Sequence, residues 1–406
     1  MSETERQPID PTTSAVFAGA VAGASASERQ PIDPLAQHER AKEPRLNKLF
    51  RFLVKQEASD LHLKAGAPPH IRIRGDMRAT TSPPLTAAEI EEMALEMLST
   101  KQTTHLEEHG SIDVAYELEG SDRFRINIYR QRGQLSLAAR RVTRNIPDFT
   151  KLNLPPVLSQ IADAEQGLVL LAGITGSGKS TTIASMLEYI NQRRACHIVT
   201  VEDPIEYLYV DKKALINQRE IGIDVESFES ALKYLMREDP DVVLIGEMRD
   251  HETFQAALQA SETGHLVFGT VHASTAGQTI SRILDLFPEA SRDLVRQSLA
   301  YNLRAIVCQK LLPCLDENVD RIPSVEIMLA SPMVRQLIEE GRDSELIDVI
   351  KGSEQEGMQD FTKSLLDLIE RDLIDPRVAY AVAPNADELK MRMKGINSGH
   401  SGLIGR

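Results

Sequence analysis

The segment GITGSGKSTT, residues 173–182, has the residue types and spacing to bind the phosphates of a nucleotide. It fits the pattern G-x-x-x-x-G-K-[ST], whose glycines let backbone N–H groups curve around phosphate oxygens beside a helix N-terminus. In this pattern Lys179 reaches the β- and γ-phosphates, and Ser180 ligates Mg²⁺. An apolar run before the segment and an amphipathic run after it make a glycine-rich turn without a ligand a poor alternative. The residues predicted to bind the nucleotide are Gly173, Thr175, Gly176, Ser177, Gly178, Lys179, Ser180 and Thr181.

A second candidate is Glu247, which follows the apolar run in DVVLIGEMRD. We expect this run to be a strand beside the strand that leads into the phosphate-binding loop. A carboxylate at the end of such a strand can polarise the water that attacks the γ-phosphate, so Glu247 is the predicted general base. A strand-end glutamate can also be only a helix cap or a solvent-exposed ion pair, but the loop upstream favours catalysis.

The stretch VEDPIEYLY places Glu202, Asp203 and Glu206 close together at the end of a neighbouring strand. Carboxylates this close repel one another unless a metal ion or an arginine neutralises them. We therefore predict Mg²⁺, its water ligands or a facing arginine beside Glu202 and Asp203. A proline-containing loop with solvated acids is the structural alternative.

Two histidines, His265 and His272, bracket the run HLVFGTVH. Their spacing places them at opposite ends of one strand, too far apart to share a metal ion. We expect His272 to lie at the same end as the acidic residues, where it could sense the γ-phosphate or serve only as a hydrogen-bonding residue. We expect His265, at the other end, to be structural.

These residues need a scaffold to position them, and the chain from residue 151 onward has the pattern of alternating strands and helices. The apolar runs GLVLLAG, HIVTVED, DVVLIGE and HLVFGTVH alternate with amphipathic segments. Near-continuous apolar strands between such helices predict an α/β fold with a parallel sheet covered on both faces. After residue 291 the pattern is almost wholly helical.

Residues 46–147 have a different, α+β pattern and predict a small separate domain. Alternation in DLHLKAG, IRIRG and RFRINIYR indicates strands with one buried face, and residues 86–98 are predicted to form a helix. In RFRINIYR, Arg123 and Arg125 lie on the face opposite the apolar residues, and further arginines such as Arg141 follow. This arginine surface is either a solvated strand edge or a surface that faces an anion.

The composition limits the classes of function that are open to the chain. Lys and Arg number 46 against 60 Asp and Glu, so the net charge of −14 disfavours binding to nucleic acid. The 3 cysteines include no C-x-x-C pair, which argues against a disulfide framework or a zinc module and fits a cytoplasmic protein. Because no apolar run is long enough to span a bilayer, we expect contact with a membrane only through a partner.

The two ends of the chain are predicted to lack a folded core. Residues 1–44 are rich in Ala, Ser, Gly and Pro, and they carry the heptapeptide ERQPIDP twice, either by accident or as a docking motif. The predicted division is a disordered tail (1–44), a small N-terminal domain (45–150), a P-loop core (151–290), a helical region (291–395) and a flexible tail (396–406).

Taken in order, four motifs resemble those of the secretion-type motor ATPases and, within them, the type IV pilus retraction ATPases of the PilT/PilU group. GITGSGKSTT resembles the Walker A motif, VEDPIEY the Asp box, REDPDVVLIGEMRD the Walker B motif and ETGHLVFGTVH the His box. SDLHLKAGAPPHIRIRGDMR resembles the start of the family's PAS-like N-terminal domain. The resemblance extends from about residue 46 to near residue 395.

The resemblance implies a RecA-like P-loop core, a smaller α+β, PAS-like domain and a helical C-terminal region. It implies that Glu206 is the Asp-box acid near the metal and the nucleotide, and that Glu247 is the catalytic glutamate. It implies that His272 couples the nucleotide state to domain movement. It also implies a homo-hexameric ring in which arginines of the small domain reach the nucleotide, and this would explain the arginine surface. The arginines at the family's positions are Arg123, Arg125 and Arg141.

By this resemblance the chain is an ATP- and Mg²⁺-dependent motor that hydrolyses ATP to drive type IV pilus retraction and twitching motility. Its implied partners are further copies of itself and an inner-membrane pilus platform protein, with a paralogous retraction ATPase as a further candidate. Its implied place is the cytoplasm, peripheral to the inner membrane. Two alternatives are a PilU-like accessory ring with little turnover, and a DNA translocase or helicase, which the net charge disfavours.

Three departures from the family's pattern bear on these alternatives. Ile174 replaces the usual proline of the Walker A motif, which changes only the stiffness of the loop. The four-cysteine zinc module of the assembly and export ATPases is missing, which favours the retraction branch. The stretch that resembles the retraction motif AIRNLIRE reads VRQLIEE, with Glu339 at the second arginine position. This stretch, QREIGIDVESF and EGMQDFTKSLLDLI favour an accessory, PilU-like member.

Overall fold

The computed structural model describes residues 43–73, 75–316 and 318–394. The predictions for the two tails, including both copies of ERQPIDP, concern residues that lie almost entirely outside these ranges. Among the described residues, no helix is both long enough and apolar enough to cross a membrane.

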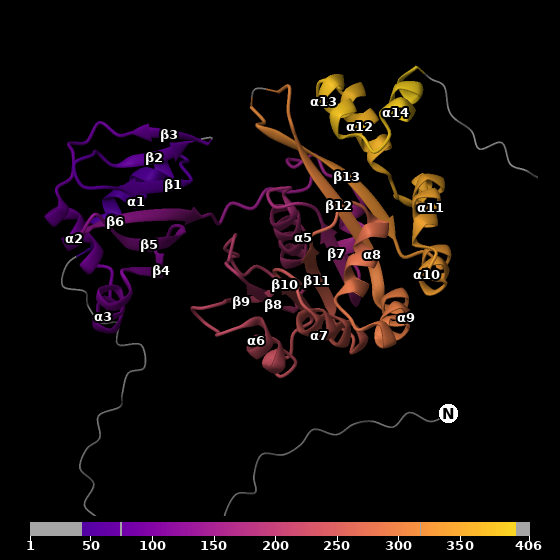
Figure 1. The fold of residues 1–406 in the computed structure, drawn as a ribbon, viewed down its shortest axis with the longest axis horizontal. Helices are drawn as coiled ribbons and strands as arrows, with labels where there is room; N and C mark the ends of the chain where they lie inside the picture. Colours follow the sequence, from indigo (N-terminus) through magenta and orange to yellow (C-terminus); the bar gives the residue numbers. More distant parts are fainter. Residues whose placement is uncertain (1–42, 74, 317, 395–406) are drawn as a thin grey trace, which may run out of the picture. The chain divides into compact units, whose positions relative to one another are not determined.

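The N-terminal part of the described chain is built on a six-stranded antiparallel sheet with the order β3-β2-β1-β6-β5-β4 (Figure 1). Its strands are β1 (Asp60–Leu63), β2 (His70–Ile73), β3 (Asp76–Ala79), β4 (Ser111–Glu117), β5 (Arg123–Gln131) and β6 (Gln134–Val142). Its helices are α1 (Leu46–Lys55), α2 (Ala87–Leu95) and α3 (Thr100–His109). The strands predicted from alternation correspond to β1, β2 and β5, and the predicted helix over 86–98 corresponds to α2.

The buried side chains of this sheet follow the alternation of the sequence. In β5, Phe124 and Ile128 are 0% exposed, whereas Arg123 and Arg125 lie partly exposed on the other face. Phe50 of α1 is fully buried and stacks on Phe124, with ring centroids 4.1 Å apart. The apolar face of the sheet is therefore closed by the apolar stripe of a helix.

Replacing Phe50 by alanine should destabilise this N-terminal part by about 3–5 kcal/mol, because a buried aromatic side chain and its stacking are lost together. Phe52 is the matched control, since it lies on the same helix but is 39% exposed. Its replacement by alanine should cost less than about 1 kcal/mol. Native-state hydrogen exchange of the β5 amides measures both losses, and equal losses would contradict this assignment of the core.

The phosphate-binding loop belongs to a second sheet of seven strands, in the order β13-β12-β7-β11-β10-β8-β9. Its strands are β7 (Gly167–Ala172), β8 (His197–Glu202), β9 (Leu215–Glu220), β10 (Val242–Ile245), β11 (Leu266–Val271), β12 (Leu303–Pro313) and β13 (Arg321–Leu329). All neighbouring strands are parallel except β12 and β13. The helices between the strands are α4 (Val157–Ala162), α5 (Lys179–Arg193), α6 (Phe228–Leu235), α7 (His251–Glu262) and α8 (Ala276–Asp285).

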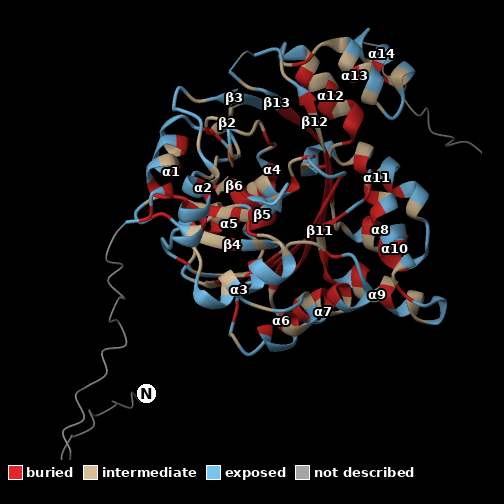
Figure 2. Cartoon of the chain, turned by 60° about the vertical axis from the view of Figure 1, so that its left-hand side comes forward, coloured by how far each residue is buried: buried red, intermediate tan, exposed pale blue. Residues whose placement is uncertain are grey.

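Both faces of this sheet are covered, as its apolar strands predicted. In β7, Leu168 and Leu170 belong to one buried cluster, while Val169 and Leu171 belong to another. Figure 2 shows β11 buried and the outer side of α8 exposed, so the helices turn their apolar faces to the sheet. The predicted α/β fold with a mainly parallel sheet is therefore confirmed.

The expected position of β10, the strand that precedes Glu247, is wrong. β10 does not lie beside β7, because β11 lies between them and pairs with both. A run of apolar residues marks a buried strand but does not indicate its neighbour, since every central strand of such a sheet is apolar on both faces. In β11, Gly269 leaves room for Met248, because a Cβ atom on this glycine would lie 2.3 Å from Met248 Cε.

The prediction of an almost wholly helical chain after residue 291 is wrong for two segments. β12 and β13 form an antiparallel hairpin, and β12 also pairs in parallel with β7. A short, mostly apolar run such as that of β12 does not distinguish a buried strand from a buried helix. The sheet that carries the loop therefore continues beyond the boundary predicted at residue 290.

The remaining elements are α9 (Arg292–Asn302), α10 (Pro332–Glu339), α11 (Leu346–Gly352), α12 (Phe361–Glu370), α13 (Pro376–Val382) and α14 (Ala386–Met393), with short 3-10 helices η1 (Glu289–Ser291), η2 (Asp343–Glu345) and η3 (Glu354–Glu356).

Candidate active site

The predicted phosphate-binding loop lies between the end of β7 and the start of α5. Gly173, Gly176 and Gly178 have φ angles of 153°, 77° and 88°, a range that side chains disfavour. Space is restricted as well, because a Cβ atom on Gly173 would lie 2.4 Å from Ser177 Oγ. The glycines of the motif are therefore required by the backbone path of the loop.

Lys179 is the first residue of α5, and its ammonium group lies over the loop. Its Nζ donates to Gly173 O at 2.8 Å and to Ile174 O at 3.1 Å. Burial lowers the pKa of Lys179, and the negative charge of Glu247 opposes that shift. Together with the backbone N–H groups at the start of α5, this ammonium gives the loop the positive charge that an anion would need.

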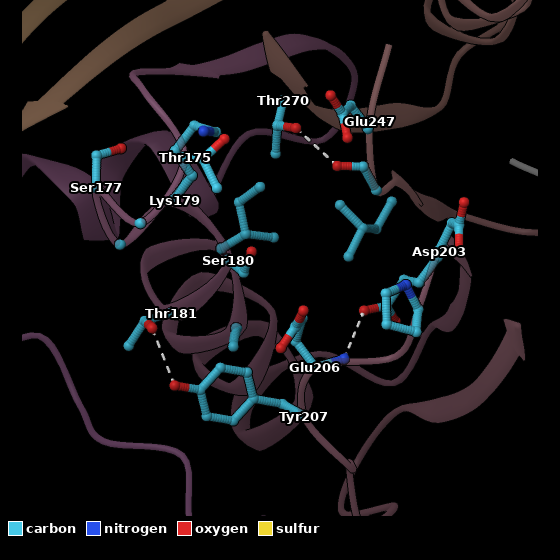
Figure 3. A pocket seen from close by; sticks show the side chains of 18 of the residues that line it. Thr175, Ser177, Lys179, Ser180, Thr181, Asp203, Glu206, Tyr207, Glu247 and Thr270 are labelled. Atoms are coloured by element: carbon cyan, nitrogen blue, oxygen red, sulfur yellow. Dashed lines mark hydrogen bonds between the residues drawn. The ribbon is translucent and has the colours of Figure 1, made fainter. Parts of the chain in front are cut away.

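A cavity of about 550 Å³ opens beside the loop and collects side chains from several elements. In Figure 3, Lys179 lies on the left side of this cavity, and Glu247 and Asp203 lie on the right. The predicted site residues that line it are Thr175, Gly176, Ser177, Gly178, Lys179, Ser180, Thr181, Glu202, Asp203, Glu206, Glu247, His272 and Arg141. The predicted site residues that do not line it are Gly173, Arg123 and Arg125.

Two side chains, Arg249 and His272, hold the carboxylate of Glu247 in place. His272 Nε2 lies 2.8 Å from Glu247 Oε1, which brings the ends of β10 and β11 together. Arg249 forms an ion pair with the same carboxylate. Partial burial acts to raise the pKa of Glu247, but the hydrogen bonds and charges of Arg249 and His272 outweigh it and hold the pKa below its usual value. The carboxylate therefore stays ionised and able to accept a proton.

Replacing His272 by alanine should move the acid limb of the pH–rate profile for ATP turnover to higher pH. In the wild-type protein the lowered pKa keeps Glu247 ionised as the pH falls. Without the imidazole the pKa of Glu247 rises, so protonation of the predicted base occurs at a higher pH. The control is His265→Ala, at the other end of β11. An acid limb that does not move in His272→Ala would contradict the role given to this hydrogen bond.

The acidic cluster divides into one buried carboxyl and two exposed ones. Glu202 Oε1 accepts from Thr200 Oγ1 at 2.7 Å, and Oε2 accepts from Glu206 N at 3.4 Å. Burial raises the pKa of Glu202 to about 7. Asp203 and Glu206 are exposed where they line the cavity. Glu202 is thus committed to hydrogen bonds inside the protein, and its neighbours are the carboxylates that face the cavity.

The arginine surface meets carboxylates of the same chain. Arg123 Nη2 lies 3.0 Å from Glu220 Oε2, and Arg125 Nε lies 3.9 Å from Glu220 Oε1. Arg141 forms an ion pair with Asp122 and is the one of the three predicted arginines that lines the cavity. These arginines are therefore engaged by carboxylates of the chain itself, and a role toward a nucleotide stays a prediction.

Sequence reasoning missed two residues, one beside Glu247 and one beside the predicted loop. Arg249 follows Glu247 by two positions, and its charge could have been noted in EMRD. Tyr207 lines the cavity, and its hydroxyl lies 2.9 Å from Thr181 Oγ1 (Figure 3). His265 is structural, as predicted, because its Nδ1 lies 2.9 Å from Ala260 O.

The residues around the cavity fit a nucleotide and a divalent cation. Ser177 Oγ is buried and has no hydrogen-bond partner among the described residues, so the loop has a donor to offer. Ser180, Asp203 and Glu206 supply the hydroxyl and carboxylate oxygens that Mg²⁺ prefers. In the part of the chain that the structure describes, no group of three or more His, Cys, Asp or Glu side chains is arranged to hold a metal ion.

Comparison with known proteins agrees with this geometry. A family model described as type II/IV secretion system protein matches residues 36–344. The type IV pilus retraction ATPase PilT of Pseudomonas aeruginosa is 40% identical over 329 residues, which cover 81% of this chain and 95% of that protein. The type IV pilus ATPase PilU of the same organism is 37% identical over 347 residues, covering 86% and 91%. A crystal structure of the pilus retraction motor PilT with bound ADP matches with a TM-score of 0.79 at 41% identity, covering 86% of this chain and 99% of that one. The resemblance inferred from the four motifs is confirmed, and the chain belongs to the type II/IV secretion system protein family and, within it, to the group of pilus ATPases that includes PilT and PilU.

Proposed function

We propose that this chain is a motor that hydrolyses ATP to drive type IV pilus retraction. The observation that carries the proposal is the arrangement around one cavity, with the cationic loop of Lys179 on one side and Glu247, paired with His272, on the other. This is the arrangement that phosphoryl transfer to water requires, with a bound phosphate and a base that faces it. The similarity to PilT supports retraction as the purpose of the hydrolysis.

Each part of the site has a role in this reaction. The loop and Lys179 bind and orient the phosphates, since their N–H groups and ammonium complement phosphate charge. Glu247 accepts the proton of the attacking water, while His272 and Arg249 keep its carboxylate ionised and oriented. Ser180, with Asp203 and Glu206 directly or through water, would hold Mg²⁺, which neutralises charge on the phosphate oxygens when it is bound.

The proposed active assembly is a homo-hexamer in the cytoplasm, peripheral to the inner membrane. Arginines of the arginine surface, Arg123, Arg125 or Arg141, would reach a nucleotide, and the ring would act on an inner-membrane pilus platform protein. The net charge of −14 supports a protein partner over nucleic acid. Contact with the membrane would run through this partner, and a paralogous retraction ATPase is a further candidate partner.

One surface observation favours a second candidate, an accessory ring that binds nucleotide with little turnover. The stretch VRQLIEE lies on α10, where Glu339 is exposed at the position of an arginine in the retraction motif. Arg335, the arginine that the stretch retains, is turned inward and donates to Ala300 O and Leu303 O. The surface offered by this stretch is therefore more acidic than that of the motif it resembles.

The first test is steady-state ATP turnover of the purified full chain, with its molecular mass measured by light scattering in the same buffer. We expect turnover that requires Mg²⁺, in an assembly of about six subunits, without stimulation by DNA. Tight ATP binding with negligible turnover would favour the accessory ring. Turnover that rises strongly when DNA is added would favour a translocase.

The second test concerns the purpose of the hydrolysis. In cells of the organism that carries the gene, deletion of the gene should leave pili extended and abolish twitching. Re-expression of the wild-type chain should restore both, whereas a chain with Lys179→Met should not. Cells that retract pili normally after the deletion would contradict the retraction role, and only the proposed ATPase activity would remain.

A further inference from the structure

Gln309 contacts both ends of the phosphate-binding loop without being part of it. It lies on β12, which extends past the end of β7, since Cys308 is the residue paired with Ala172, the last residue of β7. Gln309 O would lie 2.6 Å from a Cβ atom on Gly173, and Gln309 Nε2 would lie 2.6 Å from one on Gly178. Both ends of the loop therefore pack closely on this one residue, Gly173 against its backbone carbonyl and Gly178 against its side-chain amide.

The side-chain amide of Gln309 also binds the helix that follows the loop. Thr182, in the first turn of α5, donates from Oγ1 to Gln309 Oε1 at 2.8 Å. Gln309 is 3% exposed and Thr182 is 1% exposed, so water does not compete for this hydrogen bond. The amide thus joins β12 to α5 at the point where the loop becomes a helix.

We propose that Gln309 is a positioning residue for nucleotide binding, which holds the loop and the first turn of α5 in the shape that receives the phosphates. This inference rests on the ATP binding proposed above. The loop needs such a support because its glycines permit many backbone conformations, and ordering them on binding would reduce affinity. A loop that is held before the ligand arrives loses less conformational entropy when the ligand binds.

The support comes from the C-terminal hairpin. Gln309 is paired with Val325 of β13, and Val325 N donates to Ser364 Oγ of α12 at 3.0 Å. The strand that carries Gln309 is therefore itself held by β13, which α12 contacts through Ser364.

The expected kinetic signature is a change in KM without a change in kcat. The loop holds the phosphates both before and during the reaction, so loosening it weakens ground state and transition state alike. Gln309→Leu removes the amide at similar size and should raise KM for ATP and the dissociation constant of ADP about tenfold, with kcat within about threefold of wild type. Thr182→Val removes the other partner and should have the same effect.

The double variant Gln309→Leu/Thr182→Val tests whether the two substitutions act through one shared contact or through two independent effects. If the Thr182–Gln309 hydrogen bond carries the effect, the double variant should raise KM no further than the stronger single variant. If the fold increases in KM of the two single variants multiply in the double variant, the Thr182–Gln309 contact does not carry the effect and this role is overturned. A fall in kcat at unchanged KM would overturn it as well, because the group would then act on the chemical step.

A matched control separates positioning from general loss of stability. Ser324 is buried on β13, donates to Ser364 Oγ at 3.2 Å and does not line the cavity beside the loop. Ser324→Ala should lower Tm without changing KM or the dissociation constant of ADP. If Gln309→Leu lowers Tm and leaves both constants at wild-type values, Gln309 is only structural and the inference is wrong. If the wild-type chain binds ADP but does not turn over ATP, the motor proposal fails. The inference about Gln309 is then still tested by calorimetric measurement of ADP binding to the variants.

Discussion

Replacing Glu247 by glutamine should lower steady-state ATP turnover by about two to four orders of magnitude, because the water that attacks the phosphate loses its general base. ATP binding should persist, because Glu247 faces the loop across the cavity and contacts His272 and Arg249 rather than the loop. Glutamine has nearly the same size as glutamate and still accepts a hydrogen bond from a ring nitrogen. The variant therefore changes the charge of the site and little else.

Turnover and binding need separate measurements for this variant. Phosphate release gives the rate, and calorimetric titration with ATP, whose hydrolysis the variant no longer completes, gives the affinity. Glu252→Gln is the matched control, since Glu252 is exposed in the first turn of α7 and does not line the cavity. The control should turn over ATP at the wild-type rate. Wild-type turnover in the Glu247 variant would remove Glu247 from the mechanism and leave Asp203 and Glu206 as the remaining carboxylates that face the cavity.

Replacing Lys179 by methionine should weaken ATP binding by about two orders of magnitude or more, and turnover should be lost with it. Hydrogen bonds to a charged group contribute about 1.5–3 kcal/mol each, and the ammonium has two acceptors on the phosphates. Methionine keeps the apolar part of the side chain, so the loss comes from the charge. Calorimetric titration with ATP and Mg²⁺ measures the change.

Two further variants test whether the loss of affinity comes from the missing charge or from a disturbed loop. Lys179 Nζ also binds Gly173 O and Ile174 O, so its loss could disturb the loop itself. Lys179→Arg keeps the charge and should retain part of the affinity that Lys179→Met loses. Lys233→Met, at an exposed position of α6 and outside the cavity, should bind ATP as the wild type does. An affinity for ATP that is unchanged in Lys179→Met would show that this loop does not hold the phosphates.

The sequence by itself determined the parts of the protein that depend on neighbouring residues. The phosphate-binding loop was predictable because its glycine spacing, its lysine and its flanking strand and helix all lie within one short segment. The buried faces of β5 and of the parallel strands were predictable for the same reason, since a period of two or a continuous apolar run is a local property. The carboxylates at strand ends could be identified because parallel strands bring their carboxyl ends to one edge of a sheet.

Only the tertiary structure decided which strands and side chains lie together. β11 separates β7 from β10, and β12 joins the sheet from a region that appeared helical, because strand order depends on contacts between distant segments. The same holds for Glu220, which binds Arg123 and Arg125, and for Gln309, whose position at the loop depends on β12 pairing with β7. A buried glutamine within an apolar run gives no sign of its partner in the sequence. Its contact with Thr182 exists because folding brings residues 127 positions apart to within 2.8 Å of one another.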